Sequence, residues 1–193
     1  MSASLAQLPV TFTYAQARAA GVSKHGVYRL HDEGRIERLA RGVYRRADAE
    51  LADPDLLEIA TRAPRATLCL TTALARHGLS DEIPRAPDVA LPRGTRTPAS
   101  SAPVQWHHFD AATFDIGREI LRLDADTRIG LYSAERSIID AFRTRGHGGH
   151  ELAHGALKRW LRRASAHPST LLKLAARFPR AAAPLRQALE ILL

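Results

Sequence analysis

Two short stretches of this chain carry side chains whose types and spacing could do chemistry. Residues 150–154 read HELAH, which matches the H-E-x-x-H pattern of zinc proteases: two imidazoles one helical turn apart bind the metal, and the glutamate acts as general base. Residues 24–29 read KHGVYR, a mixture of basic and aromatic side chains typical of surfaces that bind phosphate and read base edges. The first stretch predicts an enzyme, and the second predicts a nucleic-acid-binding protein.

The surroundings of the HELAH motif argue against a zinc protease. The motif follows Gly148-Gly149, so its first histidine stands at the start of a helix. The same helix continues into the basic residues 158–163, KRWLRR, which would repel a dication. Leu157 stands where the extended metzincin pattern needs a glycine. We therefore expect no metal site, although the motif alone leaves metal binding open.

No other catalytic pattern is present in the sequence. It has no P-loop, no Gly-rich dinucleotide loop and no G-x-S-x-G elbow. None of its three lysines follows an Asp or Glu by two positions, as the Asp…Glu-x-Lys pattern of nucleases requires. We interpret the pair His107-His108 as residues of a strand end. The sequence therefore predicts no enzyme and no cofactor.

Residues 11–46 must position the basic stretch. Their capping residues and glycines predict two helices joined by a tight turn. Thr13-x-x-Gln16 has the form of a capping box, so a helix should begin directly after Thr13. Gly21 ends that helix where a left-handed residue is needed. Ser23 can cap the second helix, and Gly34 stands where that helix must stop.

A β-hairpin is predicted directly after the second helix. The apolar residues of the segment flank Arg41-Gly42, a glycine-containing turn of hairpin type. Two helices at this spacing followed by a hairpin that carries arginines predict a winged helix-turn-helix, which is a DNA-reading unit. We assign this domain to residues 1–47.

The second helix should present one face to DNA. Val27 and Leu30 are three positions apart and should point into the core, which leaves the other side of the helix exposed. A recognition helix contacts bases mainly from its N-terminal residues, and wing arginines clamp phosphates or enter the minor groove. The predicted DNA-binding residues are Thr13, Ser23, Lys24, His25, Tyr28, Arg29, Arg35, Arg38, Arg41 and Arg45.

The composition favours a polyanionic partner. The formal charge is +8 and the isoelectric point is near 10.5, and the chain has three lysines against twenty-five arginines. Arginine binds phosphate bidentately and reads guanine, so this ratio suits DNA binding. A GC-rich genome that encodes Arg in place of Lys would give the same ratio, and the sequence leaves that alternative open.

The positive charge is concentrated at the end of the chain. Residues 147–193 carry eight basic and two acidic side chains, whereas residues 1–50 carry eight and five. The densest part holds Lys158, Arg159, Arg162 and Arg163. These four residues predict a second basic surface for a polyanion or an acidic protein, with a solvated helix face as the alternative.

Residues 55–193 are predicted to form a second domain, after a polar linker at 47–54 that ends in proline. The fold class is α+β, with a mixed sheet and a helical bundle in the second domain, whose basic helical tail begins at about 147. Helices are predicted over 55–63, 67–77 and 134–145, and in three pieces after 150 that are interrupted at Pro168 and near Pro179; strands are predicted over 88–91, 104–109, 119–123 and 128–132.

The predicted location is the cytoplasm. The only cysteine, Cys69, lies in an apolar run and is interpreted as a small core residue, so no disulfide within the chain is expected. The first ten residues lack the basic and apolar regions of a signal peptide. No apolar run approaches the ~20 residues of a membrane span.

The chain resembles the AbiEi antitoxins of type IV toxin–antitoxin systems. The winged-helix part of the resemblance lies in residues 12–46, FTYAQARAAGVSKHGVYRLHDEGRIERLARGVYRR. It continues in order through LCLTTALARHGLSDEIP, DVALPRGTRTP, IGLYSAERSIIDAFRTR, HELAHGALKRWLRR and LEILL. In the family's usual pattern the segment that reads HGGHELAHGAL here is not histidine-rich, which further weakens the zinc interpretation.

The resemblance implies a transcriptional repressor that binds inverted repeats in double-stranded DNA of its own promoter, which a dimer could occupy. It also implies that the protein counteracts a nucleotidyltransferase-like AbiEii toxin, and that the C-terminal domain carries this antitoxicity and helps cooperative repression. The recognition helix would be residues 23–33 and the wing residues 35–46. A winged-helix regulator with a ligand-sensing C-terminal domain and no toxin partner remains the alternative.

Overall fold

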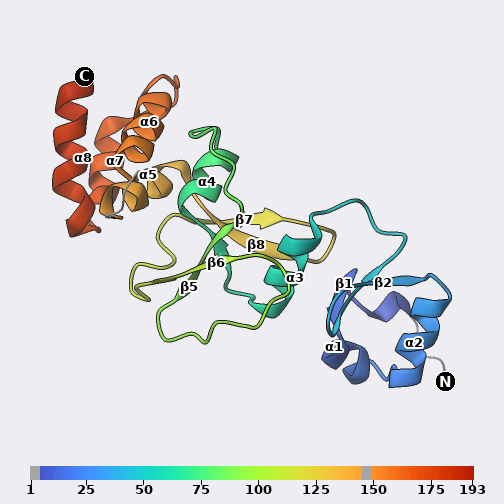
Figure 1. Cartoon of the computed structure of the whole chain (residues 1–193). Coiled ribbons are helices and arrows are strands. Elements are labelled where there is room, and N and C mark those ends of the chain that lie inside the picture. Colours follow the sequence, from blue (N-terminus) through green and yellow to red (C-terminus); the bar gives the residue numbers. More distant parts are fainter. Residues whose placement is uncertain (1–4, 145–148) are drawn as a thin grey trace. The chain divides into compact units, whose positions relative to one another are not determined.

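The computed structural model describes residues 5–144 and 149–193, and these form an α+β protein (Figure 1). The described residues contain eight α-helices, one short 3-10 helix and eight strands in two sheets. Contacts divide the chain into two compact units. Unit 1 comprises Met1–Ala66, Arg96–Pro103 and Ile120–Ile129, and unit 2 comprises Thr67–Thr95, Val104–Glu119 and Gly130–Leu193.

Residues 5–46 of unit 1 form a small helix-and-sheet assembly that we call the N-terminal module. Its elements are η1 (Leu5–Gln7), β1 (Thr11–Thr13), α1 (Tyr14–Ala19), α2 (Lys24–Asp32), β2 (Ile36–Ala40) and β3 (Val43–Arg46). The strands form a sheet of order β1-β3-β2, and both pairings are antiparallel. Phe12, Ala17, Val27 and Ile36 are buried together beneath the helices and form the centre of its core.

The predicted helix ends of the module are confirmed. Thr13 Oγ1 accepts a hydrogen bond from Gln16 N at 3.2 Å while Gln16 Oε1 accepts one from Thr13 N at 2.7 Å, which completes the capping box. Ser23 Oγ accepts a hydrogen bond from Gly26 N at 3.1 Å and caps α2. Gly21, with φ 81°, follows α1 in the left-handed conformation that glycine adopts without steric cost.

The hairpin of β2 and β3 forms where the sequence predicts it. The two strands are joined at Arg41-Gly42, and Gly42 adopts a φ of 76°. The register shifts between Arg38 and Ala40, so β2 carries a bulge close to the turn. Strand β1 pairs with the outer side of β3, a pairing that the sequence pattern did not predict.

The second sheet has five strands in the order β6-β5-β4-β8-β7. Its strands are β4 (Thr67–Leu68), β5 (Asp88–Pro92), β6 (Gln105–Phe109), β7 (Arg118–Arg122) and β8 (Arg128–Tyr132). Strand β4 pairs antiparallel with β5 and parallel with β8, and β5 pairs parallel with β6. The four strands predicted from the sequence are confirmed.

The helix predicted over residues 67–77 is wrong at its start. Thr67 and Leu68 are fully buried and form the central strand β4, whose backbone groups pair with strands on both sides. Helix α4 (Leu70–Arg76) begins only after Cys69. A continuous apolar run does not distinguish a buried strand from a buried helix, so the sequence did not reveal the change.

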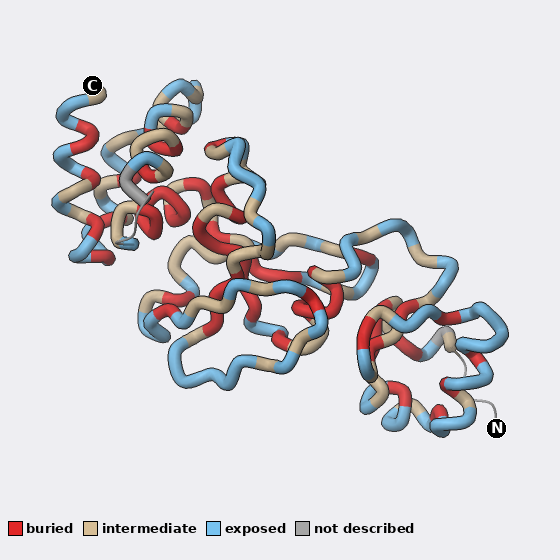
Figure 2. The backbone as a smooth tube through the Cα atoms, viewed as in Figure 1, coloured by how far each residue is buried: buried red, intermediate tan, exposed pale blue. Residues whose placement is uncertain are grey.

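The remaining helices follow the sequence closely. They are α3 (Pro54–Arg62) in unit 1, and α5 (Ala134–Arg143), α6 (Gly149–Leu161), α7 (Pro168–Ala175) and α8 (Pro179–Leu192) in unit 2. Helices α7 and α8 begin at the prolines that interrupt the predicted pattern. Buried and exposed segments alternate along α8 (Figure 2), because one side of it packs into the helical core of unit 2. None of the described helices has both the length and the apolar character needed to cross a bilayer.

Cys69 lies between β4 and α4 and is fully buried, as predicted for a small core residue. Burial raises the pKa of its thiol, because the thiolate would be poorly solvated there. The cysteine is therefore an inert part of the core that also holds Phe109, Phe114 and Tyr132.

Candidate nucleic-acid interface

Helix α2 exposes the face that the sequence assigns to DNA. Val27 and Leu30 are buried in the core of the module. Lys24, His25, Tyr28 and Arg29 are exposed on the opposite side. The spacing of the two buried residues therefore sets which side chains a partner can reach.

The exposed residues of α2 differ in what they contact. Lys24 Nζ lies 5.8 Å from the centre of the Tyr28 ring, within cation–π range. Glu33 lies between two arginines, 3.7 Å from Arg29 Nε and 3.6 Å from Arg35 Nη1. Surface ion pairs of this kind contribute little stability, so both arginines can exchange Glu33 for a phosphate.

The hairpin presents two further cations. Arg38 and Arg41 are exposed, and Arg38 Nε donates a hydrogen bond to the carbonyl of Ala40 at 3.3 Å. A contact with α3 stabilises the turn, since the carbonyl of Arg41 accepts a hydrogen bond from Arg62 Nη2 at 2.8 Å. Within the described chain no carboxylate pairs with the guanidinium of Arg41, which leaves it available to an anion.

Arg45 must be removed from the predicted DNA surface. It lies on β3 with only 5% of its surface exposed. Its guanidinium donates to the carbonyl of Glu50 and lies 3.4 Å from the carboxylate of Glu37. The alternation of β3 turns this side chain inward, whereas the sequence analysis placed it among the DNA-binding residues of the wing.

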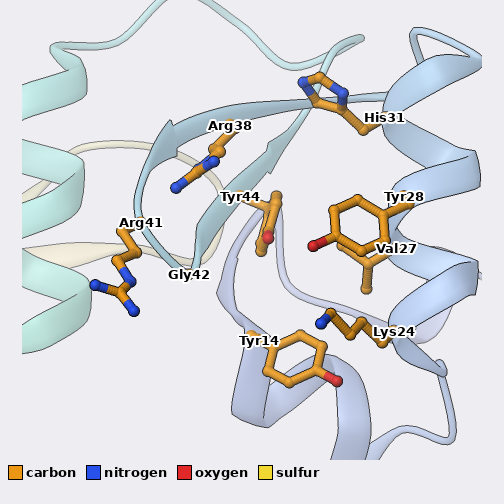
Figure 3. Close-up of a pocket in the computed structure, with 9 residues that line it drawn as sticks. All are labelled: Tyr14, Lys24, Val27, Tyr28, His31, Arg38, Arg41, Gly42 and Tyr44. Carbon is orange, nitrogen blue, oxygen red and sulfur yellow. The ribbon is translucent and has the colours of Figure 1, made fainter.

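A groove lies between α2 and the hairpin (Figure 3). Its volume is about 420 Å³, and it is lined by Tyr14, Lys24, Val27, Tyr28, His31, Arg38, Arg41, Gly42 and Tyr44. Four of these residues can carry positive charge, and none of the described residues that line it is acidic. The groove is therefore an electropositive hollow on the face predicted to meet DNA.

The structure brings together only some of the predicted DNA-binding residues. Lys24, Tyr28, Arg38 and Arg41 border the groove. His25, Arg29 and Arg35 are exposed outside its lining, and Thr13 and Ser23 use their hydroxyls to cap α1 and α2.

Tyr14, His31 and Tyr44 also present polar or aromatic side chains to the groove, and the sequence pattern did not predict them as binding residues. They come from α1, α2 and β3, so no single segment shows their proximity. The only sequence signal was the number of aromatic residues within the module, where three of the four tyrosines of the chain line one hollow.

The second basic surface is smaller than predicted. Arg159 forms a bidentate ion pair with Asp81, which lowers the pKa of that carboxyl. Arg163 donates to the carbonyl of His77. Lys158 and Arg162 are exposed, so the run KRWLRR does not present four free cations.

No metal centre is found among the described residues, where no three His, Cys, Asp or Glu side chains cluster. His154 packs against the ring of Phe142, with 5.3 Å between the ring centres. His147 and the side chain of His150 lie outside the described residues. The H-E-x-x-H motif is therefore not tested by the structure.

Comparison with known proteins gives a family match for the N-terminal part of the chain. Residues 2–47 match the family model described as transcriptional regulator, AbiEi antitoxin, which is a family of regulators and not of known enzymes. No curated relative matches the chain. The crystal structure of the RV2827C protein from Mycobacterium tuberculosis is similar with a TM-score of 0.45 and 16% sequence identity, over 95% of this chain and 76% of that one. The predicted resemblance to the AbiEi antitoxins is therefore confirmed over residues 2–47.

Proposed function

We propose that residues 1–47 form a winged helix-turn-helix that binds double-stranded DNA. Helix α2 is its recognition helix and the β2–β3 hairpin is its wing. The observation that carries this proposal is the placement of Lys24, Tyr28, Arg38 and Arg41 around one acid-free groove on the exposed face of α2. The family match over the same residues supports it independently.

Each exposed residue has a separate role in this proposal. Lys24 and His25 stand at the N-terminal end of α2, where a recognition helix reads base edges in the major groove. Arg29 and Arg35 neutralise phosphates on the flank of the helix. Arg41, at the hairpin turn, neutralises a phosphate or enters the minor groove, and Arg38 does so from β2.

The regulated target is the protein's own operon, and the partner is a nucleotidyltransferase-like AbiEii toxin. The family match supports a transcriptional regulator and a toxin partner in general terms, and the operon and the kind of toxin follow from the resemblance of the sequence to the AbiEi antitoxins. In this proposal residues 55–193 carry the antitoxin function in the cytoplasm. A reading frame for a nucleotidyltransferase beside this gene supports the toxin, whereas a metabolic operon favours a regulator without one.

The test is a gel shift with the protein's own promoter and the double variant Lys24→Ala/Arg29→Ala. Each cation lost should cost about 1–3 kcal/mol of binding, so the pair should weaken binding by roughly thirtyfold or more. Both side chains are exposed, and the thermal unfolding midpoint should therefore stay close to that of the wild type.

The matched control removes the same two charges from the tail, as Lys158→Ala/Arg162→Ala. Its promoter binding should fall much less than that of the module variant. Unchanged gel shifts for Lys24→Ala/Arg29→Ala would refute the assignment of α2 as the recognition helix.

A further inference from the structure

The groove of the N-terminal module holds more aromatic surface than contact with a phosphate backbone requires. Tyr14, Tyr28 and Tyr44 enter it from α1, α2 and β3, and Val27 adds an apolar wall. Lys24 and His31 of α2 and the two hairpin arginines supply positive charge around the rings. Phosphate groups alone would be satisfied by the cations, so the rings indicate a ligand with a flat aromatic part.

The three tyrosines present their surfaces in different ways. Tyr28 is 54% exposed, so its ring contributes little to the core and is open to a partner. Tyr44 is half-buried and is backed by Phe12, whose ring stacks on it with 6.0 Å between the centres. One ring is therefore open to approach, and another is a fixed wall of the hollow.

Figure 3 shows the positions of the basic and aromatic side chains that line the groove. The side chains of Tyr14, Lys24, Tyr28 and Tyr44 converge on the same region, and Arg38 and Arg41 stand on the hairpin side of it. The lining holds no acidic residue that would repel an anion. A ligand with an aromatic ring at one end and a phosphate at the other matches this arrangement.

We propose that this groove binds a single nucleotide unit, with its base against the tyrosine rings beside Lys24 and its phosphate toward Arg38 and Arg41 on the hairpin side. A volume of about 420 Å³ suits a small molecule of this kind. The nucleotide is either free in solution or part of a DNA strand whose base leaves the stack. The chemistry of recognition is the same in both cases.

Occupancy of the groove would compete with duplex binding, since four of its lining residues also belong to the proposed DNA face. This consequence rests on the proposed function. A nucleotide in the groove would cover Lys24 and Tyr28 and would release the promoter.

The experiment titrates the full chain with adenosine 5′-monophosphate and, separately, with a single-stranded trinucleotide, by isothermal titration calorimetry. Adenosine and ribose 5-phosphate are the half-ligand controls, and each should bind at least tenfold more weakly than the mononucleotide. Tyr28→Ala should weaken nucleotide binding by roughly tenfold, and Tyr28→Phe should restore it, because stacking needs the ring and not the hydroxyl.

Arg29→Ala separates this site from the DNA face. Arg29 is exposed on α2 but does not line the groove, so its loss should weaken promoter binding and leave nucleotide binding unchanged. Binding of the mononucleotide identifies a free nucleotide as the ligand, and binding of the trinucleotide alone identifies a strand of DNA. The proposal is overturned if neither probe binds, or if Tyr28→Ala binds as the wild type does. Promoter binding that persists in Arg29→Ala would instead count against the proposed function.

Discussion

The N-terminal module and the helices of unit 2 both hold some of their basic side chains in ion pairs or hydrogen bonds and leave others exposed. The tail carries the larger excess of positive charge, eight basic against two acidic side chains in residues 147–193. Yet Arg159 and Arg163 are held by Asp81 and by the carbonyl of His77. In the module, Lys24 and Arg41 are exposed at a groove without acidic lining. Charge density along a sequence therefore does not locate a binding surface, because contacts decide which charges remain available.

Arg136 of α5 has a structural role, because all of its contacts lie inside unit 2. It is completely buried, and its Nε lies 3.0 Å and 3.1 Å from the two carboxylate oxygens of Asp140. Its Nη1 donates to the carbonyl of Thr113 at 2.8 Å. The rings of Tyr132 and Phe178 lie 4.1 Å and 4.4 Å from the guanidinium carbon. This arginine ties the second sheet to the helical core of unit 2.

The largest effect on folding is expected when this buried charge loses its partner. Asp140 also accepts a hydrogen bond from Arg143 Nε at 2.7 Å, so Asp140→Asn leaves two guanidinium groups without a counter-ion. The free energy of unfolding, measured by chemical denaturation, should fall by about 3–5 kcal/mol.

The control for this variant is Asp81→Asn, which breaks an arginine pair at an exposed site. Its denaturation midpoint should remain close to the wild-type value. Equal losses for the two variants would contradict the distinction between structural and surface arginines in unit 2.

Glu58 of α3 provides the corresponding structural pair in unit 1. Its carboxylate accepts hydrogen bonds from Arg62 Nε at 2.7 Å and from the amides of Ser101 and Ala102 at 3.0 Å each. Burial alone would raise the pKa of Glu58, but these donors outweigh it and lower the pKa. The Glu58→Gln variant should lose about 1.5–3 kcal/mol of unfolding free energy at neutral pH.

The pH dependence of Glu58→Gln follows from the sign of the shift. A carboxyl whose pKa is lower in the folded state stabilises the fold above its unfolded pKa and loses that effect as pH falls through the folded value. The difference between wild type and variant should therefore shrink below about pH 4. Glu50 is exposed, so the control variant Glu50→Gln should have nearly the same unfolding free energy as the wild type at every pH. If the difference between wild type and Glu58→Gln stays constant down to pH 2, the lowered pKa of Glu58 does not stabilise the fold.

The local structure of the module could be predicted from its sequence because its signals are local. Thr13, Ser23 and Gly42 act within three or four residues of themselves, and caps and turns depend on such short spacings. The spacing of Val27 and Leu30 likewise predicted the exposed face of α2 correctly.

What the sequence did not reveal depends on distant partners. Strand β1 pairs with β3, whose residues lie 30 to 34 positions further along the chain, and Arg159 pairs with Asp81 at a separation of 78 residues. The inward orientation of Arg45 follows from the register of β3 in a sheet that only tertiary structure defines. The groove depends in the same way on tyrosines from three elements.

The salt dependence of promoter binding tests most directly the claim that the free cations of the module bind DNA. The logarithm of the binding constant should fall linearly with the logarithm of salt concentration, by about 0.9 for each phosphate neutralised. Lys24→Ala/Arg41→Ala should make this slope less negative by about 1 for each cation that contacts a phosphate, whereas Lys158→Ala/Arg162→Ala should leave it unchanged. A slope that becomes less negative in the tail variant and not in the module variant would show that the tail, and not the module, neutralises the phosphates.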